Sequence, residues 1–128
     1  MAQLVTRDEI LNGQEQKNPL TSTMEGNLRR LLAALNKLRL AYNKPMLVSS
    51  GYRPPEHNKK VGGAPNSCHL TCEAVDFRDK DGELKKWLLA NLDILADCGL
   101  YMEHPDATPT WCHLQIRMPN SGHRVFKP

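Results

Sequence analysis

Two segments far apart in the chain each carry a histidine in or beside a predicted strand, and their convergence would constrain the fold more than any other feature. The first segment contains His69 and, seven residues later, Asp76, while the second contains His113 within residues 111–116. Residues 74–77 alternate in character and are rich in strand formers, so Asp76 should point to the opposite face from its two neighbours. If the two strands lie close together, two imidazoles and one carboxylate meet at one point.

Two imidazoles and one carboxylate form the ligand set of a catalytic zinc ion, which keeps a fourth position open for water. Spacing alone leaves the metal site a hypothesis, because histidines are common and an aspartate at a strand end often forms a turn. Cys72 lies three residues after His69, so a zinc site that contains a cysteine is the alternative. We predict His69, Asp76 and His113 as the ligands, because they already supply a full set.

The residues around these ligands resemble a known family. The pattern Ser67-x-His69-x-x-Cys72-x-Ala74-x-Asp76 is similar to the S-x-H-x-x-G-x-A-x-D signature of the zinc D-Ala-D-Ala carboxypeptidases. That family includes the vancomycin-resistance D-Ala-D-Ala dipeptidases and the L-alanyl-D-glutamate endopeptidases of phage endolysins. Residues 49–54 resemble its S-G-Y-R segment and Trp111-x-His113 its W-x-H strand, and the three motifs occur in the family's order over about residues 45–117.

The resemblance implies a zinc peptidase that cleaves peptidoglycan stem peptides with a metal-activated water. It also implies that Arg53 lines the site and stabilises negative charge on the substrate or the oxyanion, which suits the forked geometry of a guanidinium group. Ser67 is a candidate for a hydrogen bond to a ligand or the substrate, and His104 for stabilising the oxyanion. Three bonds are alternatives for the one that is cleaved: D-Ala-D-Ala, L-Ala-D-Glu and the cross-link.

Two residues depart from the family's pattern. The family often places its general base three residues before the last histidine, where this chain has Thr110, and a threonine cannot act as a base near neutral pH. Glu103, at the end of a neighbouring predicted strand, is the substitute that we predict; Asp106, or no competent base, are the alternatives. Cys72 stands where the signature has glycine, and it would be strained if the backbone there needs a positive φ.

Two classes of function are therefore open. The first is a zinc peptidase acting on the cell wall, either as a lytic enzyme or as a virion-associated hydrolase. The second is a non-catalytic module in which zinc contributes folding energy and the fold serves binding or assembly, for example within a phage particle. The Thr110 departure favours the second class, while Arg53 and the three predicted ligands favour the first.

The bulk properties fit one soluble domain over residues 1–128, working as a monomer or within a virion assembly. Hydrophobic residues make up 40% and charged residues 24%, and the net charge is +3. No basic cluster with interleaved aromatic residues indicates nucleic-acid binding, and no apolar run approaches the ~20 residues of a membrane span. The N-terminus lacks a secretory signal, so we expect synthesis in the cytoplasm, wall access after lysis or from a virion, and free thiols at all four cysteines.

The order of the predicted elements indicates an α+β domain, with a small, mainly antiparallel sheet and the metal at its concave face. A capping box at Thr6–Glu9 opens a short helix that Gly13 ends. A long amphipathic helix over residues 22–42 and one inserted helix, capped by Asp81, pack the sheet. The remaining predictions are an N-terminal short helix and loop over 1–20, a C-terminal tail over 119–128, a loop or short helix at 56–66, and strands at 46–48, 74–77, 100–103 and 111–116.

Overall fold

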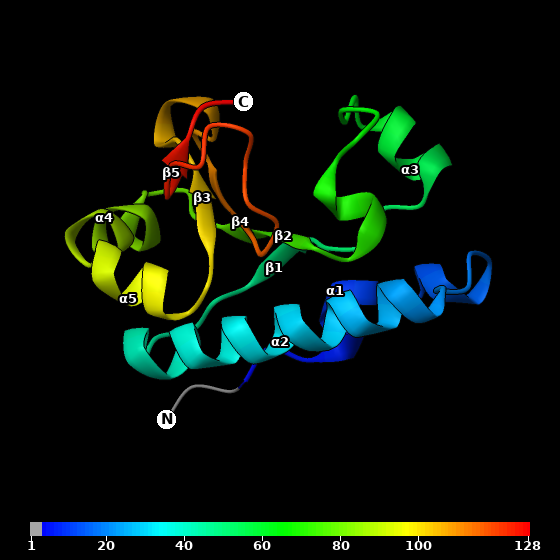
Figure 1. The fold of residues 1–128 in the computed structure, drawn as a ribbon, viewed down its shortest axis with the longest axis horizontal. Coiled ribbons are helices and arrows are strands. Elements are labelled where there is room, and N and C mark those ends of the chain that lie inside the picture. The colour runs from blue at the N-terminus through cyan, green and yellow to red at the C-terminus, as the bar shows by residue number, and fades with distance from the viewer. Residues whose placement is uncertain (1–3) are drawn as a thin grey trace.

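A five-stranded sheet forms the centre of the molecule, and helices α2, α4 and α5 lie against it (Figure 1). The computed structural model describes residues 4–128, so the first three residues of the predicted domain lie outside the described part. The α+β class is confirmed. In chain order the elements are α1 (Arg7–Leu11), η1 (Gln14–Gln16), α2 (Ser22–Tyr42), β1 (Val48–Ser50), α3 (Pro55–Lys60), η2 (Cys68–Thr71), β2 (Ala74–Arg78), α4 (Glu83–Ala90), α5 (Leu92–Asp97), β3 (Tyr101–Glu103), η3 (Pro105–Ala107), β4 (Trp111–Gln115) and β5 (Val125–Phe126).

The strands lie in the order β1-β2-β4-β3-β5, and every neighbouring pair is antiparallel except β3 with β5. The prediction of a mainly antiparallel sheet is therefore confirmed. In the register of β2 with β4, Asp76 lies directly opposite His113, and Val75 lies opposite Leu114. Because side chains alternate along a strand, Asp76 and His113 share one face of the sheet while Val75 and Leu114 share the other.

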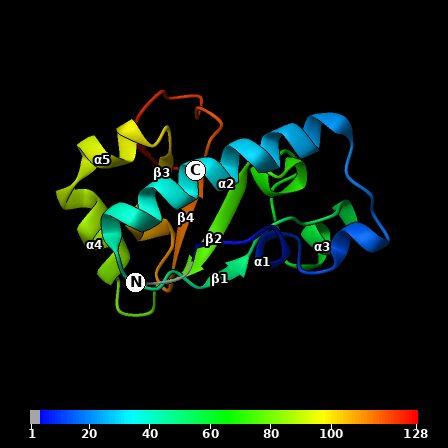
Figure 2. The same cartoon turned by 90° about the horizontal axis from the view of Figure 1, so that it is seen from below.

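The face that carries Val75 and Leu114 packs into the hydrophobic core. In the view of Figure 2, α2 lies across β2 and β4, and its buried leucines face the sheet at the spacing of an amphipathic helix: Leu28, Leu31, Leu35 and Leu38. Each fully buried leucine contributes about 1.5–3 kcal/mol relative to an exposed one. The predicted helix over 22–42 is confirmed, and within residues 4–128 no helix has the length and apolar character that a membrane span needs.

The N-terminal capping box is also confirmed. The Thr6 hydroxyl accepts a hydrogen bond from the Glu9 backbone N–H, and the Glu9 carboxylate accepts one from the Thr6 N–H. The helix ends at Leu11, earlier than predicted, because Asn12 already adopts the left-handed conformation that Gly13 continues.

Three predicted elements differ from the observed ones. The strand predicted at 46–48 lies at Val48–Ser50, because these residues pair with β2. The single inserted helix is two helices, α4 and α5, which Asn91 separates with a non-helical backbone. The predicted C-terminal tail contains β5, which pairs with β3 in parallel.

Asp79, and not Asp81 alone, caps helix α4. The buried carboxylate of Asp79 accepts hydrogen bonds from the backbone N–H groups of Leu84 and Lys85, at 3.0 Å each. The carboxylate of Asp81 accepts one from the Glu83 N–H at 3.1 Å. Sequence reasoning assigned the cap to the aspartate nearest the helix and so missed the buried one, which satisfies two of the free N–H groups of the first turn.

Gly51 brings the N-terminal segment and the sheet into direct backbone contact. A Cβ atom at this position would lie 2.2 Å from the backbone oxygen of Ile10, and that same oxygen accepts a hydrogen bond from the Tyr52 N–H at 2.8 Å. No side chain fits between these two backbones, so the position needs glycine for close approach.

We predict that Gly51→Ala lowers the free energy of unfolding by at least about 2 kcal/mol, because the new methyl group must displace backbone atoms. Gly26→Ala is the matched control, since Gly26 lies within α2 and a Cβ added there would meet no atom nearer than 3.8 Å; it should stabilise the protein by about 0.5–1 kcal/mol. Urea unfolding measures both. Equal stability of the two variants would contradict the close contact at Gly51.

Candidate metal centre

The structure brings together the three side chains that the sequence predicted as ligands. One nitrogen or oxygen atom from each of His69, Asp76 and His113 lies within 4.8 Å of the others. Asp76 and His113 are cross-strand partners on β2 and β4. His69 comes from η2, the short helix that leads the chain into β2. The candidate metal centre thus lies on the sheet face that points away from α2.

The ring of His69 is buried and is held in one orientation. Its Nδ1 lies 2.8 Å from the carbonyl oxygen of Gly51; since a carbonyl can only accept, Nδ1 carries the proton and donates it. Nε2 is then left with a lone pair. Within residues 4–128 no donor reaches this buried atom, and Asp76 Oδ1, which lies 3.3 Å away, is itself an acceptor. A buried nitrogen without a partner is costly unless something binds it, so His69 fits a metal ligand that coordinates through Nε2.

The ring of His113 carries its proton on the other nitrogen, Nε2. Its Nε2 donates to the side-chain oxygen of Gln115 at 2.7 Å, and the Gln115 amide nitrogen donates to the Arg117 carbonyl at 2.8 Å. The second bond fixes the orientation of the amide, so that its oxygen must face His113. His113 therefore presents the Nδ1 lone pair to the centre, 2.9 Å from Asp76 Oδ1.

The electrostatics of the cluster favour a positive charge at its middle. Two lone pairs that face one carboxylate oxygen repel it unless a proton or a cation lies among them. In the metal-free protein, burial opposes ionisation of Asp76, but its close contacts with His113 and His69 prevail and lower the pKa of its carboxyl. For His113 burial acts to lower the pKa, and the hydrogen bond and charge of Asp76 outweigh it, so the pKa is raised. Two nitrogen ligands and one oxygen ligand are a set that zinc accepts.

An open cleft of about 410 Å³ leads to the cluster, and Arg53, Ser67, Glu103 and Trp111 are among its lining residues. The Arg53 side chain is only 14% exposed, and its Nη2 lies 4.0 Å from Asp76 Oδ2. Burial lowers the pKa of its guanidinium, with Asp76 opposing. Ser67 is the N-cap of η2. Its hydroxyl accepts a hydrogen bond from the His69 N–H at 3.2 Å, which leaves the hydroxyl proton free to donate into the cleft.

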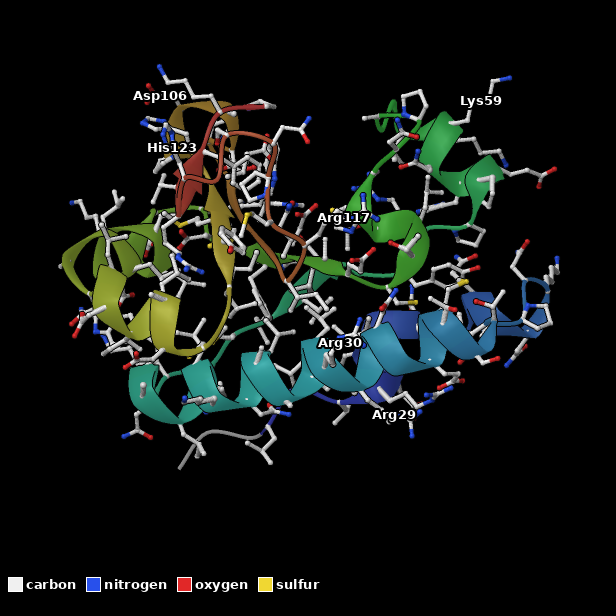
Figure 3. All side chains as sticks on the ribbon, viewed as in Figure 1. Arg29, Arg30, Lys59, Asp106, Arg117 and His123 are labelled. Carbon is white, nitrogen blue, oxygen red and sulfur yellow. The ribbon has the colours of Figure 1, made fainter. Side chains whose placement is uncertain are left out.

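Glu103 lies in the cleft and Asp106 does not. The Glu103 carboxylate, at the end of β3, is 4.0 Å from His113 Nδ1, and its side chain is 20% exposed. Burial raises the pKa of its carboxyl above the ordinary value. Asp106 is 88% exposed and lies at the outer edge of the molecule, away from Arg117 (Figure 3). The Nδ1 atom of His104 accepts a hydrogen bond from the backbone N–H of Asp106. His104 is not among the residues that line the cleft.

None of the four cysteines belongs to the cluster found among residues 4–128, and all four are free thiols. Cys72 is fully buried in the core, and burial raises the pKa of its thiol to about 12, so it is not disposed to bind metal as a thiolate. Its φ is +61°. The position where the family signature has glycine therefore does adopt the left-handed conformation, and a cysteine occupies it.

Sequence reasoning missed the residues that support the cluster from outside. Arg117 follows β4 and ties it to the segment that holds His69: it donates to Glu73 at 2.5 Å, to the Thr71 hydroxyl at 3.0 Å and to the Asn66 carbonyl at 3.2 Å. Figure 3 shows Arg117 between β4 and η2. Gln115 had a usable signal, since it lies two residues after His113 and so on the same strand face. Arg117 had no such signal in the sequence, because its hydrogen-bond partners lie more than 40 residues away along the chain.

The chain is similar to one known family of proteins. The model of the family described as Peptidase M15 matches residues 3–104, which is well over half of the chain. The matched range includes Arg53, His69, Asp76 and Glu103 and ends before His113, which the register of β4 supplies. No curated protein matches the chain.

We predict that Gln115→Leu weakens zinc binding about 10–100-fold while the fold is kept, because His113 loses the acceptor that sets its tautomer. Gln115→Glu is the comparison variant, since a carboxylate oxygen still accepts from His113 Nε2 although the bond to the Arg117 carbonyl is lost; it should lose less affinity than Gln115→Leu. Competition against a zinc chelator measures the affinity, and His113→Ala gives the value for a missing ligand. Wild-type affinity in Gln115→Leu would show that Gln115 does not set the tautomer.

Proposed function

We propose that this chain, which belongs to the peptidase M15 family, is a zinc-dependent peptidase that hydrolyses peptide bonds in peptidoglycan stem peptides. The observation that carries the proposal is the open cleft in which three metal-ligand atoms, a mostly buried carboxylate and a mostly buried guanidinium converge. A structural metal site needs ligands only and is closed, whereas a catalytic site keeps an open position and further polar groups around it.

His69, Asp76 and His113 would hold the zinc, which when bound supplies an acidified water and a polarised peptide carbonyl. We assign the general base to Glu103, because it faces the same cleft and its pKa is raised by burial. A carboxylate with a raised pKa accepts a proton from the attacking water more readily and can then deliver it to the leaving amine. Glu103 thus fills the role that Thr110 cannot.

Arg53 is assigned to the negative charge that develops as the peptide bond is attacked. Arg53 lines the cleft, and its Nη2 lies 4.0 Å from Asp76 Oδ2, which is beyond hydrogen-bond distance, so the end of the guanidinium keeps N–H groups available to a substrate. Such pre-placed donors stabilise a transition state more than a ground state. Ser67, which also lines the cleft, can donate its hydroxyl proton to the substrate backbone.

The other function considered is a zinc-stabilised module without catalysis, which the threonine at position 110 favours. Glu103 in the cleft weakens that argument, since a second carboxylate beside the candidate metal has no evident use in a purely structural site. The resemblance to phage endolysins supports a wall hydrolase that acts after lysis-type release or from a virion, and we keep that setting as part of the proposal.

We predict that Glu103→Gln lowers kcat by about 10²–10⁴-fold with zinc content unchanged, because the amide cannot take up a proton. The substrate is isolated peptidoglycan or a synthetic stem peptide, product masses identify the bond cleaved, and elemental analysis gives the zinc content. Asp106→Asn is the matched control and should keep wild-type activity, since Asp106 lies outside the cleft.

Three results would count against this assignment. Loss of activity in Asp106→Asn, or full activity in Glu103→Gln, would mean that the base is another group. A wild-type protein that binds zinc and cleaves none of the stem-peptide bonds would favour the non-catalytic module.

A further inference from the structure

A second hollow adjoins the cleft at the metal centre. This hollow measures about 520 Å³, and its lining residues are Ser49, Asp76, Arg78, Lys80, Thr110 and Trp111. Asp76 and Trp111 line both the cleft and the hollow. A bound chain that crosses the metal centre can therefore extend from one space into the other, past the side chain of Trp111.

The register of the sheet sets the distance between the hollow and the centre. Arg78 is the cross-strand partner of Trp111, and this pair lies two residues from the pair of Asp76 and His113 along each strand. Two residues along a strand span about 7 Å, and side chains two apart share a face. Since an extended peptide rises about 3.3–3.6 Å per residue, a group on the first or second residue beyond the cleaved bond would reach Arg78.

The hollow carries two positive charges that the protein itself does not neutralise. The side chains of Arg78 and Lys80 are exposed, and neither is in an ion pair within residues 4–128. Asp79, which lies between them in sequence, is buried and already accepts two backbone hydrogen bonds from α4. The carboxylate of Asp79 therefore faces the first turn of α4 and does not neutralise the charges in the hollow.

The chemistry of this hollow matches a carboxylate. A guanidinium offers two parallel N–H donors to a carboxylate, and an ammonium adds a mobile point charge. Trp111 supplies a flat, half-buried wall beside them, which can cover the aliphatic part of the residue that carries the acid. A neutral amide in the same place would lose the charge of both contacts.

We propose that Arg78 and Lys80 form a subsite for a free carboxylate of the substrate, one or two residues from the cleaved bond. The proposal rests on the proposed peptidase function and makes it specific: the enzyme selects stem peptides in which this group is an acid over those in which it is amidated. The carboxylate can belong to an internal D-glutamate residue or to the C-terminus of the stem, and both are tested.

The experiment compares three synthetic stem peptides with the zinc-loaded enzyme. The first has both carboxylates free, the second has the internal D-glutamate carboxylate amidated, and the third has the C-terminus amidated. We expect one of the two amidations to lower kcat/KM by at least about tenfold, the effect of losing a charge-assisted contact of about 1.4 kcal/mol. The affected peptide identifies the source of the carboxylate.

The double variant Arg78→Gln/Lys80→Gln assigns that preference to the hollow. It should cleave the disfavoured amidated peptide as the wild type does and lose most of the preference for the acid. Arg29→Gln/Lys59→Gln is the matched control, because it removes one exposed arginine from α2 and one exposed lysine from α3 (Figure 3). Neither residue lines the hollow or the cleft, so this variant should keep the preference.

The outcomes separate this proposal from the one on which it rests. Equal cleavage of all three peptides by the wild type, or a preference that survives in Arg78→Gln/Lys80→Gln, overturns the carboxylate subsite and leaves the peptidase in place. Cleavage of none of them, by a wild type with full zinc content, overturns both.

Discussion

The cross-strand pairing of Asp76 with His113 is the contact on which the rest of the site depends. It exists because β2 and β4 are antiparallel in a register that places these two residues opposite each other. A slip of one residue would turn one strand over relative to the other, so that its core-face side chains would lie on the site face. The core prevents this slip, since Val75, Phe77 and Leu114 are fully buried against the helices. Hydrophobic packing on one face thus fixes the polar geometry on the other.

The support for the ligands reaches well outside the three motifs. Gly51 holds His69 through its carbonyl oxygen, and Gly51 is itself held by its backbone contact with Ile10 in α1. On the other side, Gln115 holds His113 and is held in turn by the Arg117 carbonyl. Each histidine therefore presents one defined nitrogen, as bound metals require of their ligands. The short N-terminal helix thus supports the candidate metal centre although none of its residues belongs to the cluster.

The sequence predicted most where the signals are short-range. Thr6 and Glu9 form a capping box within four residues, and the spacing of leucines reveals α2 without any knowledge of its partners. The convergence of His69, Asp76 and His113 followed from motif resemblance together with strand alternation. The misses are long-range: β5 is too short to show a pattern, and Asp79 was not distinguishable from Asp81 until its burial was known. The support from Arg117 depends on contacts with Thr71 and Glu73, which no local pattern encodes.

The central claim is that His69, Asp76 and His113 bind one ion with defined atoms, and anomalous diffraction at the zinc edge from zinc-loaded crystals tests it most directly. The account predicts one strong peak about 2.0–2.2 Å from His69 Nε2, His113 Nδ1 and a carboxylate oxygen of Asp76, with a further position open to the cleft. A peak held by His113 Nε2, by a cysteine, or at a place remote from these three residues would contradict it.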